Sequence, residues 1–514
     1  MKVIVGNAWP YANGSLHIGR VCSWLPGDLL ARYHRAKGDD VIFLSGSDCH
    51  GAQVLSKAKD LGKTPKEISD IYHREFIRCF NKLEFSFDIF NRTDSQNHIE
   101  TVKKFILNLC SNEHIYEKEI EQYFCDNCLK YVEVDNLTNN KCKFCGTLTS
   151  IKKSKHLFLK ISKFEKNIKN MINKQEGWRE NAIKITNRYL DGGLRDRVVT
   201  GDIEWGIEVP IDGFDDKKIY VWIEALMGYL TTSMQYANQK NKNFEEYWNT
   251  KNSRVYLIHG KENIPFHSIV FPSILYGLGI NNFNIRILSS EYLNLEGKTF
   301  STNKNWAIWM PYMLDRYPVD SIRYYMIRRG PEKKDSDFTW KDFVNINNNE
   351  LVGVLGNFIN RTLIFVKKNF DGILEKRTLN KAWKIEIIKA YDFVGKCFEN
   401  GEFKEALKYI LNLIEKTNCF FDNKKPWQLL NSDIEEAKDV VYVCSQVVIT
   451  LSQLLNPIIP NACEQIRDFF NINEVIWGFN EVKFIKIKNL STIFNRIERR
   501  VALEEVKKLK LKKI

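Results

Sequence analysis

The first fifty residues constrain the fold most strongly, because they hold two buried-strand patterns separated by one helical pattern. Residues 3–5 (VIV) form a short apolar run that stops at Gly6, and residues 41–44 (VIFL) form a second run. An amphipathic stretch from about Ile18 to Lys37 lies between them. A strand, a helix and a strand of these lengths form a βαβ unit, which predicts a parallel sheet.

Further buried-strand patterns indicate that this sheet is split by an insertion. Residues 219–222 (IYVW), 255–258 (VYLI) and 285–288 (IRIL) are expected to be strands. Between about 115 and 215 the pattern is lost, and that segment carries paired cysteines, many lysines and DGGLR at 191–195. We therefore expect an α/β catalytic domain built on a split, Rossmann-like parallel sheet with an inserted module.

From about residue 346 onward an all-α helical bundle is expected. Apolar residues between 403 and 414 recur at steps of three and four, which is typical of a helix with one buried face. Residues 440–460 carry no charge, so a membrane span is an alternative there. Their polar side chains, two prolines and helical spacing favour a buried bundle helix instead.

Composition narrows the class of protein. The 514 residues correspond to roughly three domains or one core with insertions. The apolar share of 44% and the charged share of 27% are those of a globular protein and exclude a disordered chain, a coiled coil and a collagen-like fibre. The net charge of +13 suggests a polyanionic partner such as nucleic acid. Residues 1–6 are too short an apolar stretch for a signal peptide, and we expect no membrane anchor.

Four of the twelve cysteines form two CxxC pairs separated by thirteen residues, namely Cys125, Cys128, Cys142 and Cys145. Two such turns place four thiolates at tetrahedral spacing, which predicts about one structural zinc ion per chain. A redox pair and a chance spacing are the alternatives. The other eight cysteines are scattered and are expected to be free thiols in a reducing, cytoplasmic compartment.

Residues 10–20 (PYANGSLHIGR) lie between the first strand and the first helix. A helix N-terminus offers free N–H groups and partial positive charge, which suit a phosphate. Gly14 and Gly19 let the backbone approach a ligand, and His17 can donate a hydrogen bond to a phosphate oxygen. Each residue alone is explained by a turn or a helix cap, but the combination predicts a phosphate-binding loop.

This string resembles the first signature of class I aminoacyl-tRNA synthetases, and in particular the methionyl-tRNA synthetase family. HIG at 17–19 matches the family's His-Ile/Leu-Gly-His, and Arg20 replaces the final histidine. The resemblance covers nearly the whole chain and continues in SDCHG at 47–51, YVWIEA at 220–225, GKE at 260–262, FHS at 266–268 and VDSIRYY at 319–325.

The resemblance implies activation of methionine by ATP with Mg²⁺, followed by transfer of the methionyl group to a tRNA with the anticodon CAU. It also implies a division of the chain into two catalytic halves at 1–114 and 217–292, an insertion at 115–216 with its zinc knuckle at 125–145, a signature-loop and linking segment at 293–345, and an anticodon-binding bundle at 346–514. Because no further module follows the bundle, a monomer is expected. The basic tail helix expected from Val501 onward, with Lys507, Lys508, Lys510, Lys512 and Lys513, is either a solvated face or an RNA contact.

By the same resemblance, TFSTN at 299–303 matches the family's second signature, Lys-Met-Ser-Lys-Ser, so that Thr302 replaces its second lysine. Lys298 and Lys304 flank the loop, and either can supply the missing charge. Gly201 is a third departure, where the family usually has arginine. The candidates for contact with the phosphates are His17, Arg20, Lys298 and Lys304, and those for ATP binding are Asn13, Gly14, His17, Gly19, Ser301 and Thr302.

The amino-acid site is carried over residue by residue. Asp48 matches the carboxylate that holds the substrate's α-amino group. The residues matching the methionine side-chain site are Ala8, Trp9, Tyr11, Trp222, Ala225, Tyr229 and His267, whose aromatic rings suit a thioether. Trp9 replaces the family's usual leucine and Leu226 replaces a common proline, which can shift substrate choice unless Trp9 points away from the pocket.

Two signals in the helical part match the family's anticodon readers. Asn357 and Arg361 are four residues apart and share one helix face. Trp427 follows Pro426 at a helix entry, where an indole can stack on an unstacked base. The alternatives are a core position for Trp427 and a solvated Arg361.

Three other functions fit parts of the sequence. A diverged paralogue that activates another amino acid, or serves a resistance or biosynthetic pathway, is motivated by Trp9, Arg20, Gly201 and Thr302. A non-catalytic tRNA-binding protein fits the altered signatures, but it would have no use for Asp48 and an amino-acid pocket. A generic zinc-ribbon nucleic-acid binder would not need the split sheet.

Overall fold

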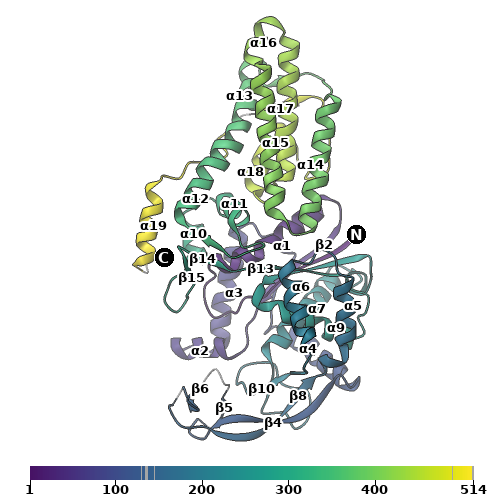
Figure 1. Cartoon of the computed structure of the whole chain (residues 1–514), viewed down its shortest axis with the longest axis vertical. Coiled ribbons are helices and arrows are strands. Elements are labelled where there is room, and N and C mark those ends of the chain that lie inside the picture. The colour runs from purple at the N-terminus through teal and green to yellow at the C-terminus, as the bar shows by residue number, and fades with distance from the viewer. Residues whose placement is uncertain (129, 133–136, 144, 489, 512–514) are drawn as a thin grey trace.

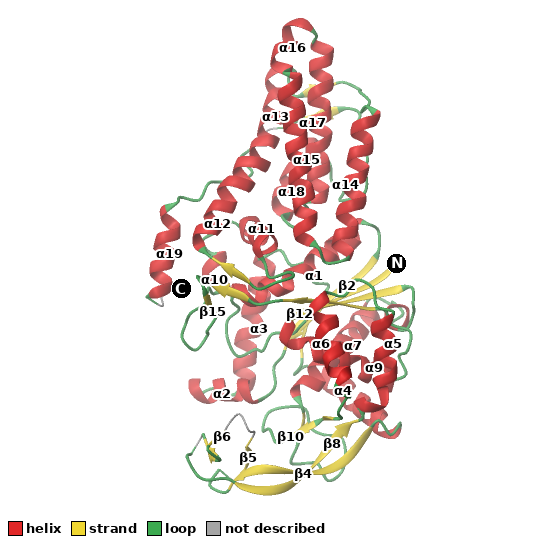
Figure 2. Ribbon diagram, viewed as in Figure 1, coloured by secondary structure: helices red, strands yellow, loops and turns green. Residues whose placement is uncertain are grey.

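The computed structural model describes residues 1–128, 130–132, 137–143, 145–488 and 490–511. A five-stranded parallel sheet in the order β13–β12–β1–β2–β3 forms its centre (Figures 1 and 2). The strands are β1 (Lys2–Asn7), β2 (Asp40–Ser47), β3 (Ile89–Arg92), β12 (Ser253–Gly260) and β13 (Ile285–Ser290). β2 pairs with one edge of β1, and β12, which comes much later in the sequence, pairs with the other edge. A crevice therefore forms at the carboxyl ends of β1 and its neighbours.

Helices cover both faces of this sheet, as expected for parallel strands buried on both sides. They are α1 (Ile18–Ala36), α3 (Pro65–Lys82), α4 (Gln96–Ser111), α7 (Val221–Gln239), α8 (Glu245–Trp248) and α9 (Phe271–Gly277), with a 3₁₀ turn at Lys261–Asn263 and a π-helical turn at Phe266–Val270. A further helix, α2 (Ala52–Leu61), packs on α3. The strand predicted at residues 219–222 is wrong, because β11 (Lys218–Ile219) is only two residues long and α7 begins at Val221. A run of four apolar residues is too short to show a helical or a strand periodicity. It therefore does not distinguish a buried strand from the start of a buried helix.

The insertion extends from the sheet as a long antiparallel ribbon, seen at the foot of Figure 2. Its two long strands are β4 (Ile115–Cys125) and β8 (Ser150–Leu159), and the paired cysteines lie at their far end, beginning with Cys125. The smaller elements are β5 (Lys130–Val132), β6 (Leu137–Thr138), β7 (Lys141–Cys142), β9 (Arg197–Val198), β10 (Thr200–Gly201), a 3₁₀ turn at Ile161–Phe164, α5 (Glu165–Asn173) and α6 (Glu180–Asp191).

A linking segment connects the sheet to a helical bundle. It contains β14 (Leu293–Leu295), β15 (Lys298–Thr299), α10 (Met310–Leu314), α11 (Val319–Arg329) and β16 (Ser336–Phe338). The bundle is built from α12 (Trp340–Ile346), a π-helical segment at Asn347–Gly356, α13 (Asn357–Asn369), α14 (Lys381–Glu399), α15 (Phe403–Lys424), α16 (Pro426–Ser432), α17 (Ile434–Leu454) and α18 (Pro460–Phe470), with β17 (Ile373–Leu374) and β18 (Ile485–Lys486) beside it. The bundle stands at the opposite end of the molecule from the ribbon (Figure 1). A separate helix, α19 (Arg500–Lys510), ends the described chain, and Lys512 and Lys513 lie outside the described residues.

The uncharged stretch at 440–460 lies mostly in α17, whose side chains are almost all buried, so the predicted bundle helix is confirmed. Across the part of the chain that the structure describes, no helix has the length and apolarity to cross a bilayer.

A buried ion pair fixes the bundle on the catalytic part. The Arg323 guanidinium of α11 donates to the Asp28 carboxylate of α1 at 2.6 Å, and both side chains are inaccessible to solvent. The same guanidinium donates to the carbonyl oxygens of Pro457 and Ile458, at 2.8 and 2.9 Å. Because an unpaired buried charge is costly, these bonds hold the turn between α17 and α18 against α1.

Candidate active site

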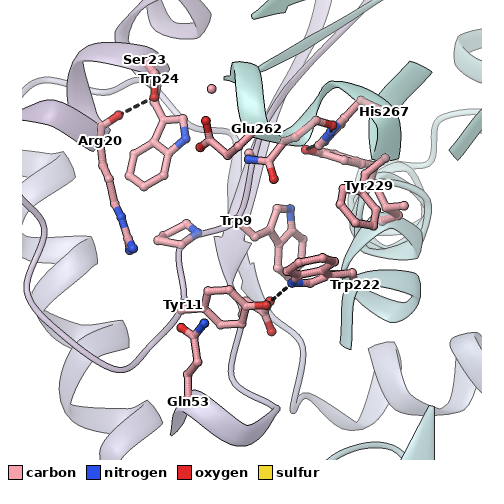
Figure 3. Close-up of a pocket in the computed structure, with 18 residues that line it drawn as sticks. Trp9, Tyr11, Arg20, Ser23, Trp24, Gln53, Trp222, Tyr229, Glu262 and His267 are labelled. Carbon is pink, nitrogen blue, oxygen red and sulfur yellow. Dashed lines mark hydrogen bonds between the residues drawn. The ribbon is translucent and has the colours of Figure 1, made fainter. Parts of the chain in front are cut away.

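A cavity of about 280 Å³ lies at the carboxyl ends of β1, β2 and β12 (Figure 3). It is formed by the segments that follow these strands, together with the first turns of α1 and α7. All eight residues expected at the amino-acid site line it, namely Ala8, Trp9, Tyr11, Asp48, Trp222, Ala225, Tyr229 and His267. The topology thus gathers residues from four separate stretches of the chain at the crevice.

Asp48 is a buried carboxylate with unused hydrogen-bonding capacity. Only 3% of the residue is exposed, and its Oδ1 has no hydrogen-bond partner among the described residues. Burial raises the pKa of Asp48 well above the usual range, and the nearby Glu224 carboxylate raises it further. Because no cation of the protein compensates this charge within the described structure, the site is suited to a cationic group of a ligand.

The loop that carries Asp48 is held from two sides. His50 lies beside the Glu224 carboxylate of α7, with 2.8 Å between Nδ1 and Oε1, and both side chains are buried. The Trp205 indole of the insertion donates to the Cys49 carbonyl oxygen at 2.7 Å. Trp205 was not predicted as a site residue, because nothing in its local pattern indicates a partner more than 150 residues earlier.

Aromatic and imidazole rings form the wall opposite Arg20 (Figure 3). The His267 Nδ1–H donates to the Asn263 carbonyl oxygen at 2.9 Å, so Nε2 accepts from the Tyr229 hydroxyl, also at 2.9 Å. Burial lowers the pKa of His267 to about 4, so the ring is neutral at physiological pH. The Trp222 indole donates to the Tyr11 hydroxyl. This uncharged, polarisable wall suits a thioether side chain.

Trp9 does not point away from the cavity. Its indole fits between two glycines, since a Cβ added at Gly46 or Gly228 would lie 2.6 or 2.8 Å from the ring. The indole Nε1 is buried without a hydrogen-bond partner in the described residues. A larger residue at either glycine would displace Trp9, so these three positions together set the shape of the pocket.

The other side of the cavity carries the features expected of a phosphate site. Arg20 lines it together with Ser23, Trp24 and Glu262, of which the last three were not predicted. The Arg20 guanidinium makes no hydrogen bond or ion pair within the described chain. The backbone carbonyl oxygen of Arg20 accepts a hydrogen bond from the Ser23 hydroxyl at 2.7 Å (Figure 3). Burial lowers the pKa of Arg20 and the Glu262 carboxylate opposes this shift. Ser23 and Trp24 follow Arg20 by one helical turn, which is the signal that could have found them.

The two signature segments contact each other beside the cavity. The His17 ring stacks on Phe300, with 5.0 Å between centroids, and meets Trp309 edge-on. Burial lowers the pKa of His17 to about 3, so this ring is also neutral. Gly19 is needed here, because a Cβ on it would lie 3.1 Å from the Phe300 ring.

The structure does not bring the remaining ATP candidates into the cavity lining. Lys298 lies over the Trp306 ring, 4.9 Å from its centroid, and Lys304 is exposed. Ser301 and Thr302 belong to the same loop, which is closed by hydrogen bonds in both directions between the backbones of Ser301 and Trp306. Asn13 and Gly14 lie at the rim, where the Asn13 amide donates to Gln53 at 3.2 Å.

The four thiols expected to bind zinc lie together at the end of the ribbon. Their Sγ atoms are all within 4.8 Å of one another. Tetrahedral coordination with Zn–S distances of about 2.3 Å separates the sulfurs by about 3.8 Å, so this spacing fits zinc. The Cys128 N–H donates to Cys125 Sγ at 3.5 Å, and Gly146 takes the left-handed conformation that closes the second turn. All twelve cysteines are free thiols.

The anticodon candidates gather at the far end of the bundle. Asn357 and Arg361 lie on α13, and Trp427 lies in the first turn of α16 with 44% of its surface exposed. The Arg361 guanidinium stacks over Phe421 at 4.1 Å, and the Trp427 ring is 6.0 Å from the same phenyl ring. Arg361 also pairs with Asp422. Phe421 and Asp422, which were not predicted, thus place the arginine and the exposed indole on one surface.

A parallel sheet with this strand order, two signature segments meeting at its crevice and a helical bundle behind it define a class I aminoacyl-tRNA synthetase. The family model "tRNA synthetases class I (M)" matches residues 3–133 and 125–363, and the model "Anticodon binding domain of methionyl tRNA ligase" matches residues 378–500. The chain belongs to the methionine--tRNA ligase family.

Full-length relatives and solved structures agree with this assignment. The chain is 41% identical to methionine--tRNA ligase 1 of Alkaliphilus oremlandii, over 99% of this chain and 100% of that protein. It is also 41% identical to the methionine--tRNA ligase of Bacillus mycoides, over 99% of both chains. A crystal structure of Mycobacterium tuberculosis methionyl-tRNA synthetase bound by methionyl-adenylate has the same fold, with a TM-score of 0.84 at 22% identity, over 96% of this chain and 100% of that one.

Proposed function

We propose that the protein activates methionine with ATP and Mg²⁺ and then esterifies the methionyl group to tRNA. The observation that carries this proposal is the cavity of Figure 3, which combines three complementary surfaces. The Asp48 carboxylate, whose Oδ1 has no partner among the described residues, suits the α-ammonium group. The ring wall at His267 suits the thioether, and Arg20, which forms no ion pair in the described chain, suits a phosphate. Methionine-dependent exchange of pyrophosphate into ATP, lost in Asp48→Asn, tests the proposal.

In the first step the methionine carboxylate attacks the α-phosphorus of ATP in line, and pyrophosphate leaves with the bonding electrons. The protein positions the two substrates and stabilises the phosphate charge, with no covalent enzyme intermediate. Arg20 is in place for the phosphates in the present geometry, and the neutral His17 can donate one hydrogen bond. Lys298 or Lys304 reaches the leaving pyrophosphate only when the signature loop moves over the cavity. Mg²⁺ bound with ATP would supply further positive charge to the phosphates.

In this proposal, segments 1–114 and 217–292 carry the chemistry, and the linking segment at 293–345 carries the mobile loop. The insertion at 115–216 holds one structural zinc ion, bound by Cys125, Cys128, Cys142 and Cys145. When bound, zinc would fix the two thiolate turns relative to each other. We expect metal analysis of protein purified without chelators to find about one zinc per chain, and finding none would contradict this part.

The bundle at 346–514 reads the anticodon CAU through Asn357, Arg361 and Trp427. The exposed Trp427 ring supports this role, because its position beside the Arg361–Phe421 stack offers a platform for an unstacked base. The protein acts as a monomer in translation, and this role places it in the cytoplasm.

Trp427→Ala is expected to raise the KM for tRNA about 5- to 150-fold, because stacking of one base is worth about 1–3 kcal/mol. The KM for methionine in pyrophosphate exchange should stay unchanged. Phe393→Ala is the matched control, since this ring is also exposed on the bundle, 38% against 44%, but lies on α14. Equal changes in both KM values, or no change in either, would contradict the anticodon role.

A further inference from the structure

The C-terminal helix α19 uses one face to pack on the linking segment and on the first helix of the bundle. Ala502, Glu505 and Leu509 are buried, and the helix packs against α12. The Glu505 carboxylate accepts a hydrogen bond from the Tyr312 hydroxyl at 2.7 Å and pairs with Lys508 at 2.7 Å. Tyr312 lies on α10, directly after the second signature loop. The helix is therefore fastened next to the second signature segment, which borders the cavity.

The outward face of α19 is cationic. With 3.6 residues per turn, four exposed basic residues point to the same side, namely Arg499, Arg500, Lys507 and Lys510. Leu503 lies at the centre of this face and is 78% exposed. Of the four cations only Arg500 has an acidic partner in the described chain, Glu498. The other three form no ion pair within that part of the molecule, and one exposed carboxylate, Glu504, lies at the edge of the same face.

The position of α19 in the molecule indicates which polyanion its cationic face would contact. In Figure 1 the helix lies, along the long axis, between α16 at the tip of the bundle and α2 beside the catalytic sheet, on the same side as β15. A tRNA whose anticodon meets Trp427 and whose acceptor end enters the cavity has to span this interval. Lysine and arginine side chains along such a path bind phosphates by charge and release of counterions.

We propose that the cationic face of α19 binds the sugar–phosphate backbone of tRNA between its anticodon and its acceptor end. This inference rests on the proposed charging of tRNA and adds a third contact region to the cavity and the anticodon reader. The contact is independent of sequence, because it involves phosphates, and Leu503 adds apolar contact with a ribose.

The test is a triple variant, Arg499→Gln with Lys507→Gln and Lys510→Gln. We expect the KM for tRNA to rise about tenfold near 0.1 M salt, and the slope of log(kcat/KM) against log[salt] to become shallower by about 2 to 3 for the lost phosphate contacts. Pyrophosphate exchange without tRNA should not change. The matched control is Lys166→Gln with Lys169→Gln and Lys174→Gln, which removes three exposed charges on and beside α5.

A charge-conserving variant, Arg499→Lys with Lys507→Arg and Lys510→Arg, should retain the wild-type KM and slope. An unchanged tRNA KM and slope in the glutamine variant would overturn the inference. So would an equal loss of pyrophosphate exchange, since α19 would then act through the catalytic site. Direct tRNA binding by fluorescence anisotropy needs no catalysis, so weakened binding by the glutamine variant supports the inference even if the wild type proves inactive.

Discussion

Asp48→Asn is expected to lower kcat/KM for methionine about 30- to 4000-fold in pyrophosphate exchange. Losing one partner of a buried, hydrogen-bonded charge pair costs about 2–5 kcal/mol, and each 1.4 kcal/mol is tenfold. The KM for ATP should change little, because the proposal assigns Asp48 to the α-ammonium group and Arg20 to the phosphates. Thermal stability is the control, since a variant that had merely unfolded would also be inactive.

The folded protein should be no less stable with asparagine at this position. The folded-state pKa of Asp48 is raised, so its ionisation destabilises the native state as the pH rises from the unfolded pKa through the folded one. Asparagine removes this cost at neutral pH. For the same reason the wild-type kcat/KM for methionine should decline on the acid side at a higher pH than for an ordinary aspartate, because the carboxyl group must be ionised to hold the ammonium group. A lower melting temperature together with an unchanged acid limb would contradict this role of Asp48.

Arg20→Ala is expected to reduce kcat for pyrophosphate exchange about 10²- to 10³-fold, because a preorganised charge in a water-poor site contributes about this much to a transition state. The guanidinium lines the cavity, so its truncation breaks no hydrogen bond or ion pair within the described chain. The KM for methionine should change far less than kcat.

Arg20→His, which restores the family's signature residue, should recover part of the lost rate. Arg188→Ala on α6 is the matched control, because that side chain is exposed and remote from the cavity lining. A kcat within twofold of wild type in Arg20→Ala would assign the phosphate contact to Lys298 or Lys304 alone.

The strands of the sheet could largely be predicted, because parallel strands buried on both faces leave apolar runs at residues 3–5, 41–44, 255–258 and 285–288. Residues 219–222 have the same local composition, yet α7 begins among them. These residues begin a helix and not a strand because α7 packs against β2 and β3. Both strands are distant in the sequence, so a window of four residues does not reveal this packing.

The site could be predicted as a set of residues but not as a geometry. Asp48 was predicted from its match to the family's amino-acid site, whereas its raised pKa depends on burial and on Glu224, which is 176 residues later. The orientation of Trp9 depends on Gly46 and Gly228, which only the folded chain brings to its two sides. In the same way, the sequence did not show which of the cationic candidates lines the cavity. In the folded chain Arg20 does, whereas Lys298 lies over the Trp306 ring.

The most direct test of the central claim is pyrophosphate exchange into ATP by the wild-type protein, measured without tRNA for each of the twenty amino acids. We expect exchange with methionine alone, because a cavity with one buried carboxylate and a neutral aromatic wall selects an amino acid with an uncharged, polarisable side chain. Exchange with a different amino acid, or with none of the twenty, would contradict it.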